Sequence, residues 1–349
     1  MGKKKNSVLI TGVCGQDGSY MAELCVANGL QVHGLARVTL NPNLSRLANL
    51  IDNKSNSGEF NLHFGDITDS NYIRNLLEDI NPDFVFNFAA QSHVKTSFQL
   101  PELTFNVNTL GYLNILNSLS RSKKETFLYQ ASSSELFGDS PPPQSFTTSF
   151  SPVSPYAISK LSSHSLKESY QPIGSVKICN GILFNHESFR RSEYFVTKKI
   201  VKNALRIKNE ILIGKNNSKT IEKLRLGNLD AKRDWGWAPE YMIGVFQRAM
   251  SGDSTQLFIG TGESASVRQF ASRVFQNLDL ELQDWLDHDI ELIRISEVNH
   301  LEAKKSDVKK SLGWLPQYNW ESLCDLMCEE ELLNSGKQIN WVDLLSERS

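Results

Sequence analysis

Several features are scarce in this sequence of 349 residues, and each scarcity excludes a class of protein. No apolar run approaches the roughly 20 residues that a membrane-spanning helix needs. The five cysteines show no paired metal-ligand spacing, and their odd number favours reduced thiols in a cytosol over a disulfide framework. The formal net charge of −2 provides no bulk field for nucleic acid. We therefore expect a cytoplasmic protein with no metal site, no membrane segment and no nucleic-acid partner.

The first motif present is a glycine-rich loop between a strand and a helix. Residues 7–11 have the pattern of a short apolar strand, and a helical pattern begins near Tyr20. Glycines between them permit a tight turn and the close approach of a pyrophosphate to the helix N-terminus, where free amides favour anions. This order predicts a dinucleotide-binding loop formed by Gly12, Gly15, Gln16, Asp17 and Gly18.

Four further strand signals, near 31–36, 62–64, 84–88 and 126–130, alternate with helical segments. The alternation predicts a doubly wound parallel sheet of the Rossmann type, which binds ligands at the carboxyl ends of its strands. Arg37 ends the second strand, where a guanidinium suits the 2′-phosphate of NADP. The other expected cofactor contacts are Asp66, Ile67, Ala89, Ala90, Gln91 and Ser92. Asp66 could instead cap the following helix.

Two motifs in this part of the chain carry catalytic side chains. Ser154-Pro155 is a helix-entry signal, so Tyr156 and Lys160 are expected one turn apart on one helix face. The ammonium would favour the phenolate and draw the tyrosine pKa from about 10 toward neutrality. The strand near 126–130 leads to Ser133, a hydrogen-bond donor, and Glu135, a carboxylate able to move a second proton. The combination predicts hydride transfer coupled to elimination.

The chain resembles the nucleotide-sugar 4,6-dehydratases, a branch of the extended short-chain dehydrogenase/reductase family. Asn-His-Glu-Ser at 185–188 and Gly-Asn-Leu-Asp-Ala at 227–231 are the most specific matches. The other matching segments are 9–12, 15–20, 89–95, 129–132, 134–136, 154–157, 183–184, 196–200, 226 and 232–236. The resemblance implies NADP as cofactor, a nucleotide-sugar substrate with GDP-mannose expected, and a homodimer or homotetramer.

The resemblance also implies a lyase reaction. In these enzymes the residue matching Tyr156 takes the proton from the sugar O4 while C4 transfers a hydride to NADP. The residue matching Glu135 then removes the C5 proton and helps the C6 hydroxyl leave as water, after which the hydride returns to C6. Ser133 stands where the family usually has threonine. Cofactor contacts are implied for His186 and Arg191, and GDP-sugar contacts for Asn185, Lys199, Arg225, Arg294 and Glu297.

The chain has room for one nucleotide-binding domain and a smaller lobe. We expect the first at residues 1–180, with returns near 226–250 and 290–300, and a mainly nucleotide-sugar-binding lobe at 181–349. The loop at 140–145 is predicted to be a partial lid beside the active site.

Three alternative functions remain open. The first is a 4,6-dehydratase of another nucleotide sugar. The second is an epimerase or 4-keto-sugar reductase of the same family, which generally lacks a glutamate at the position of Glu135. The third is a non-catalytic NADP-binding sensor, which would be expected to lose Tyr156 or Lys160.

Overall fold

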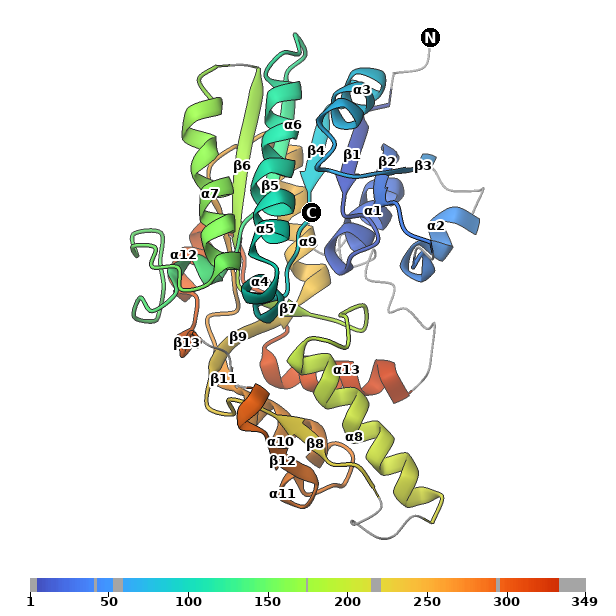
Figure 1. Ribbon diagram of the computed structural model, residues 1–349, viewed down its shortest axis with the longest axis vertical. Helices are drawn as coiled ribbons and strands as arrows, with labels where there is room; N and C mark the ends of the chain where they lie inside the picture. The colour runs from blue at the N-terminus through green and yellow to red at the C-terminus, as the bar shows by residue number, and fades with distance from the viewer. Residues whose placement is uncertain are drawn as a thin grey trace.

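The computed structural model describes residues 5–40, 43–52, 59–173, 175–214, 221–292 and 296–332. A parallel sheet of seven strands has the order β10-β6-β5-β4-β1-β2-β3 (Figure 1). This confirms the predicted doubly wound α/β fold. The strands are β1 (Ser7–Thr11), β2 (Gln31–Arg37), β3 (Glu59–Gly65), β4 (Phe84–Asn87), β5 (Thr126–Ala131), β6 (Val176–Leu183) and β10 (Leu257–Ile259).

The sheet is apolar on both faces because helices cover both of them. On one side Val8 and Ile10 of β1 share a core with α1 (Gln16–Ala27) and α9 (Ala238–Ser251). On the other side Leu9 shares a core with α3 (Ser70–Ile80) and α6 (Gly111–Leu119). This alternation explains why β1 is an uninterrupted apolar run rather than an amphipathic one.

The front face of the sheet domain also carries a long broken helix and α7 (Pro155–Tyr170) (Figure 1). The broken helix consists of α4 (Val94–Gln99), α5 (Pro101–Phe105), the π-helical turn η2 (Asn106–Leu110) and α6. Smaller helical segments are η1 (Ser45–Leu47), α2 (Ala48–Asp52) and η3 (Ser134–Phe137). None of the helices that the structure describes is both long and apolar enough to cross a bilayer.

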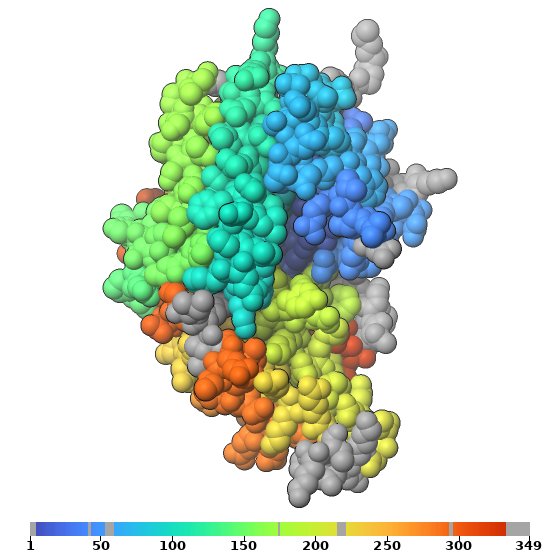
Figure 2. All heavy atoms as spheres, in the orientation of Figure 1, coloured from blue at the N-terminus to red at the C-terminus, as the bar shows by residue number. Residues whose placement is uncertain are grey.

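The strand order reverses between β1 and β4, and ligands of doubly wound sheets bind in the crevice at this point. The smaller lobe lies below that end of the sheet (Figures 1 and 2). Its strands are β7 (Asn185–Glu187), β8 (Leu224–Leu226), β9 (Lys232–Trp237), β11 (Ser264–Ser266), β12 (Leu286–His288) and β13 (His300–Leu301). Its helices are α8 (Val196–Leu212), α10 (Val267–Gln276), α11 (Leu282–Trp285), η4 (Ile290–Leu292) and α13 (Trp320–Leu332).

The lobe is linked to the sheet domain at two places. The edge strand β10 comes from a part of the chain that the sequence analysis assigned to the lobe, and α12 (Lys305–Leu312) packs beside it. β9 pairs with β7, which directly follows β6 of the large sheet. The lobe is therefore held against the carboxyl ends of the central strands.

Candidate active site

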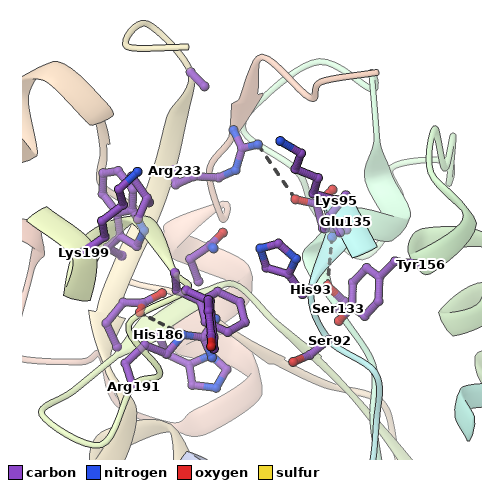
Figure 3. A pocket seen from close by; sticks show the side chains of 18 of the residues that line it. Ser92, His93, Lys95, Ser133, Glu135, Tyr156, His186, Arg191, Lys199 and Arg233 are labelled. Atoms are coloured by element: carbon purple, nitrogen blue, oxygen red, sulfur yellow. Dashed lines mark hydrogen bonds and ion pairs between the residues drawn. The ribbon is translucent and has the colours of Figure 1, made fainter. Parts of the chain in front are cut away.

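A cavity of about 800 Å³ lies where the sheet domain meets the lobe (Figure 3). Its walls come from the loops after β4 and β5, from α7, from β7 and the loop that follows it, and from α8 and β9. Twelve of the predicted site residues line it: Asp17, Ala90, Ser92, Ser133, Glu135, Tyr156, Lys160, Asn185, His186, Arg191, Lys199 and Glu297.

Local capping positions the predicted catalytic side chains. Ser154 Oγ accepts a hydrogen bond from the amide of Ala157 at 3.1 Å, so α7 begins as predicted, with Tyr156 in its first turn. Ser133 caps η3 by accepting a hydrogen bond from the amide of Glu135 at 3.2 Å. The Ser133 side chain also interacts with the Tyr156 hydroxyl, an interaction that lowers the pKa of the tyrosine. The serine therefore links the tyrosine to the loop that carries the glutamate.

The protonation of Tyr156 differs from the prediction. Burial raises the pKa of Tyr156 to about 12, and the neighbouring Ser133 side chain offsets only part of this effect. Lys160 donates its Nζ hydrogen bond to the carbonyl of Ala131 at 2.9 Å, and burial lowers its own pKa to about 8. The predicted shift of the tyrosine pKa toward neutrality is thus wrong for this structure, because desolvation dominates and the Glu135 charge also raises the pKa.

The glycine loop has the shape that a pyrophosphate site requires. Gly12 has a φ of +68°, and a Cβ there would lie 2.7 Å from the amide nitrogen of Ala89. A Cβ on Gly18 would lie 2.4 Å from the carbonyl oxygen of Gly12. No side chain among the described residues caps α1 at Gly15, so the first amides of the helix face the loop without a side-chain acceptor. The loop therefore fits the diphosphate of a dinucleotide.

Asp17 and Gln16 tie this loop to the Asn-His-Glu-Ser segment. Asp17 Oδ2 lies 3.0 Å from His186 Nε2, and His186 Nδ1 lies 2.8 Å from the carbonyl oxygen of Phe184. Burial opposes both charges, but their mutual attraction lowers the pKa of Asp17 to about 2 and raises the pKa of His186. The Gln16 amide donates to the His186 carbonyl oxygen at 3.1 Å and accepts from Ser188 Oγ at 2.9 Å.

The residues expected around the adenosine lie farther out. Arg37 is exposed at the end of β2. Asp66 Oδ1 accepts hydrogen bonds from the amide and hydroxyl of Thr68, at 2.9 and 2.7 Å. Asp69 caps α3 by accepting from the amides of Asn71 and Tyr72, so the alternative that Asp66 caps this helix is wrong. The remaining expected contacts at strand ends are Ile67, Ala89 and Gln91.

Not every residue predicted to hold the sugar nucleotide reaches the cavity. Lys199 lines it and donates to the carbonyl oxygen of Arg225 at 2.6 Å. The Arg225 guanidinium is half-exposed and pairs with Asp289 at 2.6 Å, and it is not part of the cavity wall. Arg294 lies outside the described residues, whereas Glu297 lines the cavity.

The loop at 140–145, predicted to be a lid, is instead held in place by hydrogen bonds of the Gln144 side chain. The buried Gln144 side chain donates to the carbonyl oxygens of Ser140 and His300, at 2.9 and 3.1 Å, and accepts from the amide of Glu302 at 2.8 Å. None of the described residues 139–151 lines the cavity. The loop joins the sheet domain to the β13 segment, so the lid prediction is wrong.

Three residues in or beside the cavity were missed by the sequence analysis. Arg233 of β9 places Nη2 3.8 Å from Glu135 Oε1, with both side chains nearly buried. His93 lines the cavity and caps α4. Asn108, in the π-helical turn, accepts from the amide of Gln91 at 2.8 Å and donates to Ser159 Oγ at 2.9 Å. Arg233 and His93 fall in segments that match the dehydratases, which was the available signal. Asn108 sits in an ordinary helical pattern.

Comparison with known proteins agrees with this geometry. The family model described as GDP-mannose 4,6 dehydratase matches residues 9–327. The chain is 41% identical over 330 residues to GDP-mannose 4,6 dehydratase 2 of Arabidopsis thaliana, covering 93% of this chain and 86% of that protein. It is 36% identical to GDP-mannose 4,6-dehydratase of Vibrio cholerae, with 94% of each chain covered. The human GDP-mannose 4,6 dehydratase is 35% identical, with 93% and 90% covered.

Solved structures share the fold at lower identity. The dTDP-glucose 4,6-dehydratase of Bacillus anthracis, in complex with NAD, superimposes with a TM-score of 0.78 at 18% identity, covering 94% of this chain and 97% of that one. The UDP-glucose 4-epimerase of Thermotoga maritima, with UDP-glucose, also gives 0.78 at 21% identity, covering 93% and 98%. These two structures support the fold alone. The family model and the sequence relatives together assign this chain to the GDP-mannose 4,6-dehydratase family.

Proposed function

We propose that this protein is a GDP-mannose 4,6-dehydratase that converts GDP-mannose to GDP-4-keto-6-deoxymannose and water. One observation carries the proposal. Ser133, Glu135, Tyr156 and Lys160 line a single cavity, which also contains Lys199 on the lobe side. A hydroxyl, a carboxylate and a basic tyrosine in one cavity are what oxidation at C4 followed by elimination requires.

The cofactor of the proposed reaction is NADP. The glycine loop would hold its diphosphate at the start of α1, and Arg37 would hold its 2′-phosphate at the end of β2. Lys160 and the loop after β4 would hold the nicotinamide ribose end, because they line the same cavity as Tyr156. A nicotinamide dinucleotide bound there would accept a hydride from C4 of the sugar and return it to C6.

Tyr156 acts as the base for the O4 proton in this proposal. Its hydroxyl interacts with the Ser133 side chain, and both residues line the cavity, so the serine can also contact O4 when the sugar is present. With a pKa raised to about 12, the phenolate needs positive charge nearby. The buried Lys160 ammonium, one helical turn away, supplies that charge.

Glu135 performs the second proton transfer. Its carboxylate faces the cavity, and the 3.8 Å separation from Arg233 exceeds hydrogen-bonding distance. Arg233 and Glu135 therefore attract each other electrostatically, but no hydrogen bond between them fixes the carboxylate oxygens. These oxygens can approach the C5 proton and the C6 hydroxyl. This carboxylate favours a dehydratase over an epimerase or reductase of the same fold.

A homodimer is the proposed assembly. Leu103, Leu110 and Ile158 are more than 40% exposed and lie on α5, η2 and α7. α5 and α6, drawn in teal, form part of the outer surface of the molecule (Figure 2). Burial of this apolar face against a second copy would remove it from water.

Mass spectrometry of the product tests the function. The protein should be incubated with GDP-mannose and, in parallel, with CDP-, UDP- and dTDP-hexoses. We expect loss of one water from GDP-mannose alone, with no stoichiometric NADP consumed, because the hydride returns to the sugar. Water loss from a different nucleotide sugar would reassign the substrate. Steady NADPH accumulation matched to product would identify a simple dehydrogenase.

A further inference from the structure

His93 has a fixed tautomer. The imidazole Nδ1 accepts a hydrogen bond from the backbone amide of Thr96 at 3.3 Å, as the N-cap of α4, and lies 2.8 Å from Thr96 Oγ1. A backbone amide can only donate, so Nδ1 carries no proton. The ring is therefore neutral, with its proton on Nε2, and Nε2–H is a hydrogen-bond donor.

The ring is also fixed in orientation. His93 meets the Phe195 ring edge to face, with centroids 5.8 Å apart and an interplanar angle of 85°. The Arg191 guanidinium covers the Phe195 ring at 3.5 Å from its centroid. His93 thus joins the sheet domain to the loop after β7, and its side chain is restrained by contacts from both sides.

The ring lies in the cavity that contains the proposed catalytic groups. His93, Ser133, Glu135 and Tyr156 all line it, and Figure 3 draws the imidazole within the cavity, next to Glu135 in that view. In the proposed function, Tyr156 and Ser133 serve O4, whereas Glu135 serves C5 and C6. The elimination end of the sugar thus has a base but no assigned hydrogen-bond donor for the departing oxygen.

We propose that His93 is a further catalytic residue, whose Nε2–H donates a hydrogen bond to the C6 hydroxyl of the hexose as that hydroxyl leaves. The inference rests on the proposed dehydratase function. A donor aimed at an oxygen that gains negative charge stabilises the transition state more than the ground state.

The proton balance assigns His93 a hydrogen bond and no proton transfer. The C5 proton moves to the Glu135 carboxylate, and the C5–H electron pair forms the C5–C6 double bond while the C6–O bond breaks. The departing hydroxyl takes the proton that Glu135 now carries and leaves as water. His93 keeps its Nε2 proton throughout, as expected for a neutral imidazole, which is a poor acid but an effective donor.

The tautomer can be measured without turnover. Histidine labelled with nitrogen-15 distinguishes a protonated from an unprotonated ring nitrogen by its NMR shift. A spectrum of the holoenzyme at neutral pH, assigned by comparison with His93→Gln, should show Nδ1 unprotonated and Nε2 protonated. A proton on Nδ1 would remove the donor from the cavity and overturn the proposal.

Rapid mixing with GDP-mannose separates oxidation from elimination. His93→Ala should form NADPH, read at 340 nm, at close to the wild-type rate. It should lose water about 10- to 100-fold more slowly, so the reduced cofactor accumulates. His93→Gln keeps an N–H donor on a side chain of similar length. It should therefore lose water at least about tenfold faster than His93→Ala. His288→Ala, at an exposed position of β12, is the matched control.

The outcomes are distinguishable. Equal slowing of NADPH formation and water loss by His93→Ala, or no effect on either, would overturn the role of His93. The same holds if His93→Gln performs no better than His93→Ala. If the wild-type protein itself removes no water from GDP-mannose, the proposed function fails, and the role of His93 fails with it. If His93→Ala does not fold, the glutamine variant and the NMR measurement decide.

Discussion

Asp17 and His186 form a partly buried ion pair that connects the glycine loop to β7, with Oδ2 and Nε2 3.0 Å apart. His186 Nδ1 must donate to the carbonyl oxygen of Phe184, so both ring nitrogens carry protons and the imidazole is cationic. The ring also stacks on Tyr241, with centroids 4.7 Å apart. The sequence analysis expected both residues to contact the cofactor. In the structure they also set the distance between the cofactor loop and the segment proposed to bind the sugar nucleotide.

Replacement of one partner should destabilise the protein more than replacement of both. Asp17→Asn or His186→Gln leaves a partly buried charge unpaired, and we expect a loss of up to about 3 kcal/mol in the free energy of unfolding for each. The double variant should lose less than the sum. Urea denaturation of the wild type, the two single variants and the double variant gives the four free energies of a double-mutant cycle. Additive losses would show that the two groups do not interact.

The same pair predicts a pH dependence. The pKa of His186 is raised above its ordinary value of 6.5, so its stabilisation is complete below that pH and is lost as pH rises through the raised pKa. The pKa of Asp17 is lowered from 3.8 to about 2, so its contribution is present above pH 3.8 and lost as pH falls toward 2. Thermal melts should therefore show less alkaline destabilisation in His186→Gln than in the wild type.

Two substitutions separate the proposed catalytic roles. Tyr156→Phe should slow NADPH formation with GDP-mannose by about 10²- to 10⁴-fold, because the O4 proton has no base. Glu135→Gln should still form NADPH but should fail to release water. Stopped-flow absorbance at 340 nm and mass spectrometry of the product measure the two steps. Tyr170→Phe on the same helix and Glu125→Gln, at the residue just before β5, are controls outside the cavity. Wild-type dehydration by Glu135→Gln would remove this residue from the mechanism.

Local signals explain what could be predicted from the sequence. Ser154 and Pro155 mark the start of α7 within a few residues of Tyr156, and Gly12 marks a turn that only glycine adopts easily. The apolar runs identify buried parallel strands because both faces of the sheet are covered. The fold and the position of the glycine loop depend on such short stretches.

The remaining features depend on contacts between distant segments. Arg233 reaches Glu135 only because β9 pairs with β7, and the Gln144 side chain is held by a hydrogen bond to the carbonyl oxygen of His300 in β13. The pKa of Tyr156 is set by desolvation, which depends on everything packed around the side chain. No local pattern around these residues indicates their partners, so the missed arginine and the wrong lid prediction share one cause.

Glu330 on α13 predicts a second stability effect, of opposite sign to that of Asp17. Burial raises its pKa from 4.5 to about 7, and its Oε2 is buried with no hydrogen-bond partner among the described residues. Its stabilisation is therefore complete below pH 4.5 and is lost as pH rises through 7. Glu330→Gln should be more stable than the wild type at pH 8, by about 1–3 kcal/mol, and nearly equal at pH 5. Urea denaturation at both pH values measures this, with the exposed neighbour Glu329→Gln as control.

Cofactor preference tests the role proposed for Arg37. Arg37 is exposed at the end of β2, and the next residue, Val38, offers no second charge. One charge-assisted hydrogen bond to the 2′-phosphate contributes about 1.5–3 kcal/mol, which corresponds to roughly 10- to 100-fold tighter binding of NADP than of NAD. Arg37→Ala should abolish most of this preference and leave the affinity for NAD nearly unchanged, because NAD has no phosphate at that position.

Calorimetric titration of the wild type and of Arg37→Ala with both cofactors measures the four dissociation constants directly and needs no turnover. Arg74→Ala, which removes an exposed guanidinium from α3, is a control for the loss of surface charge. The difference between the two cofactors should also shrink as salt is raised, because an exposed guanidinium is screened. Equal or tighter binding of NAD by the wild type would refute NADP as the preferred cofactor. An unchanged preference in Arg37→Ala would place the phosphate contact on another residue.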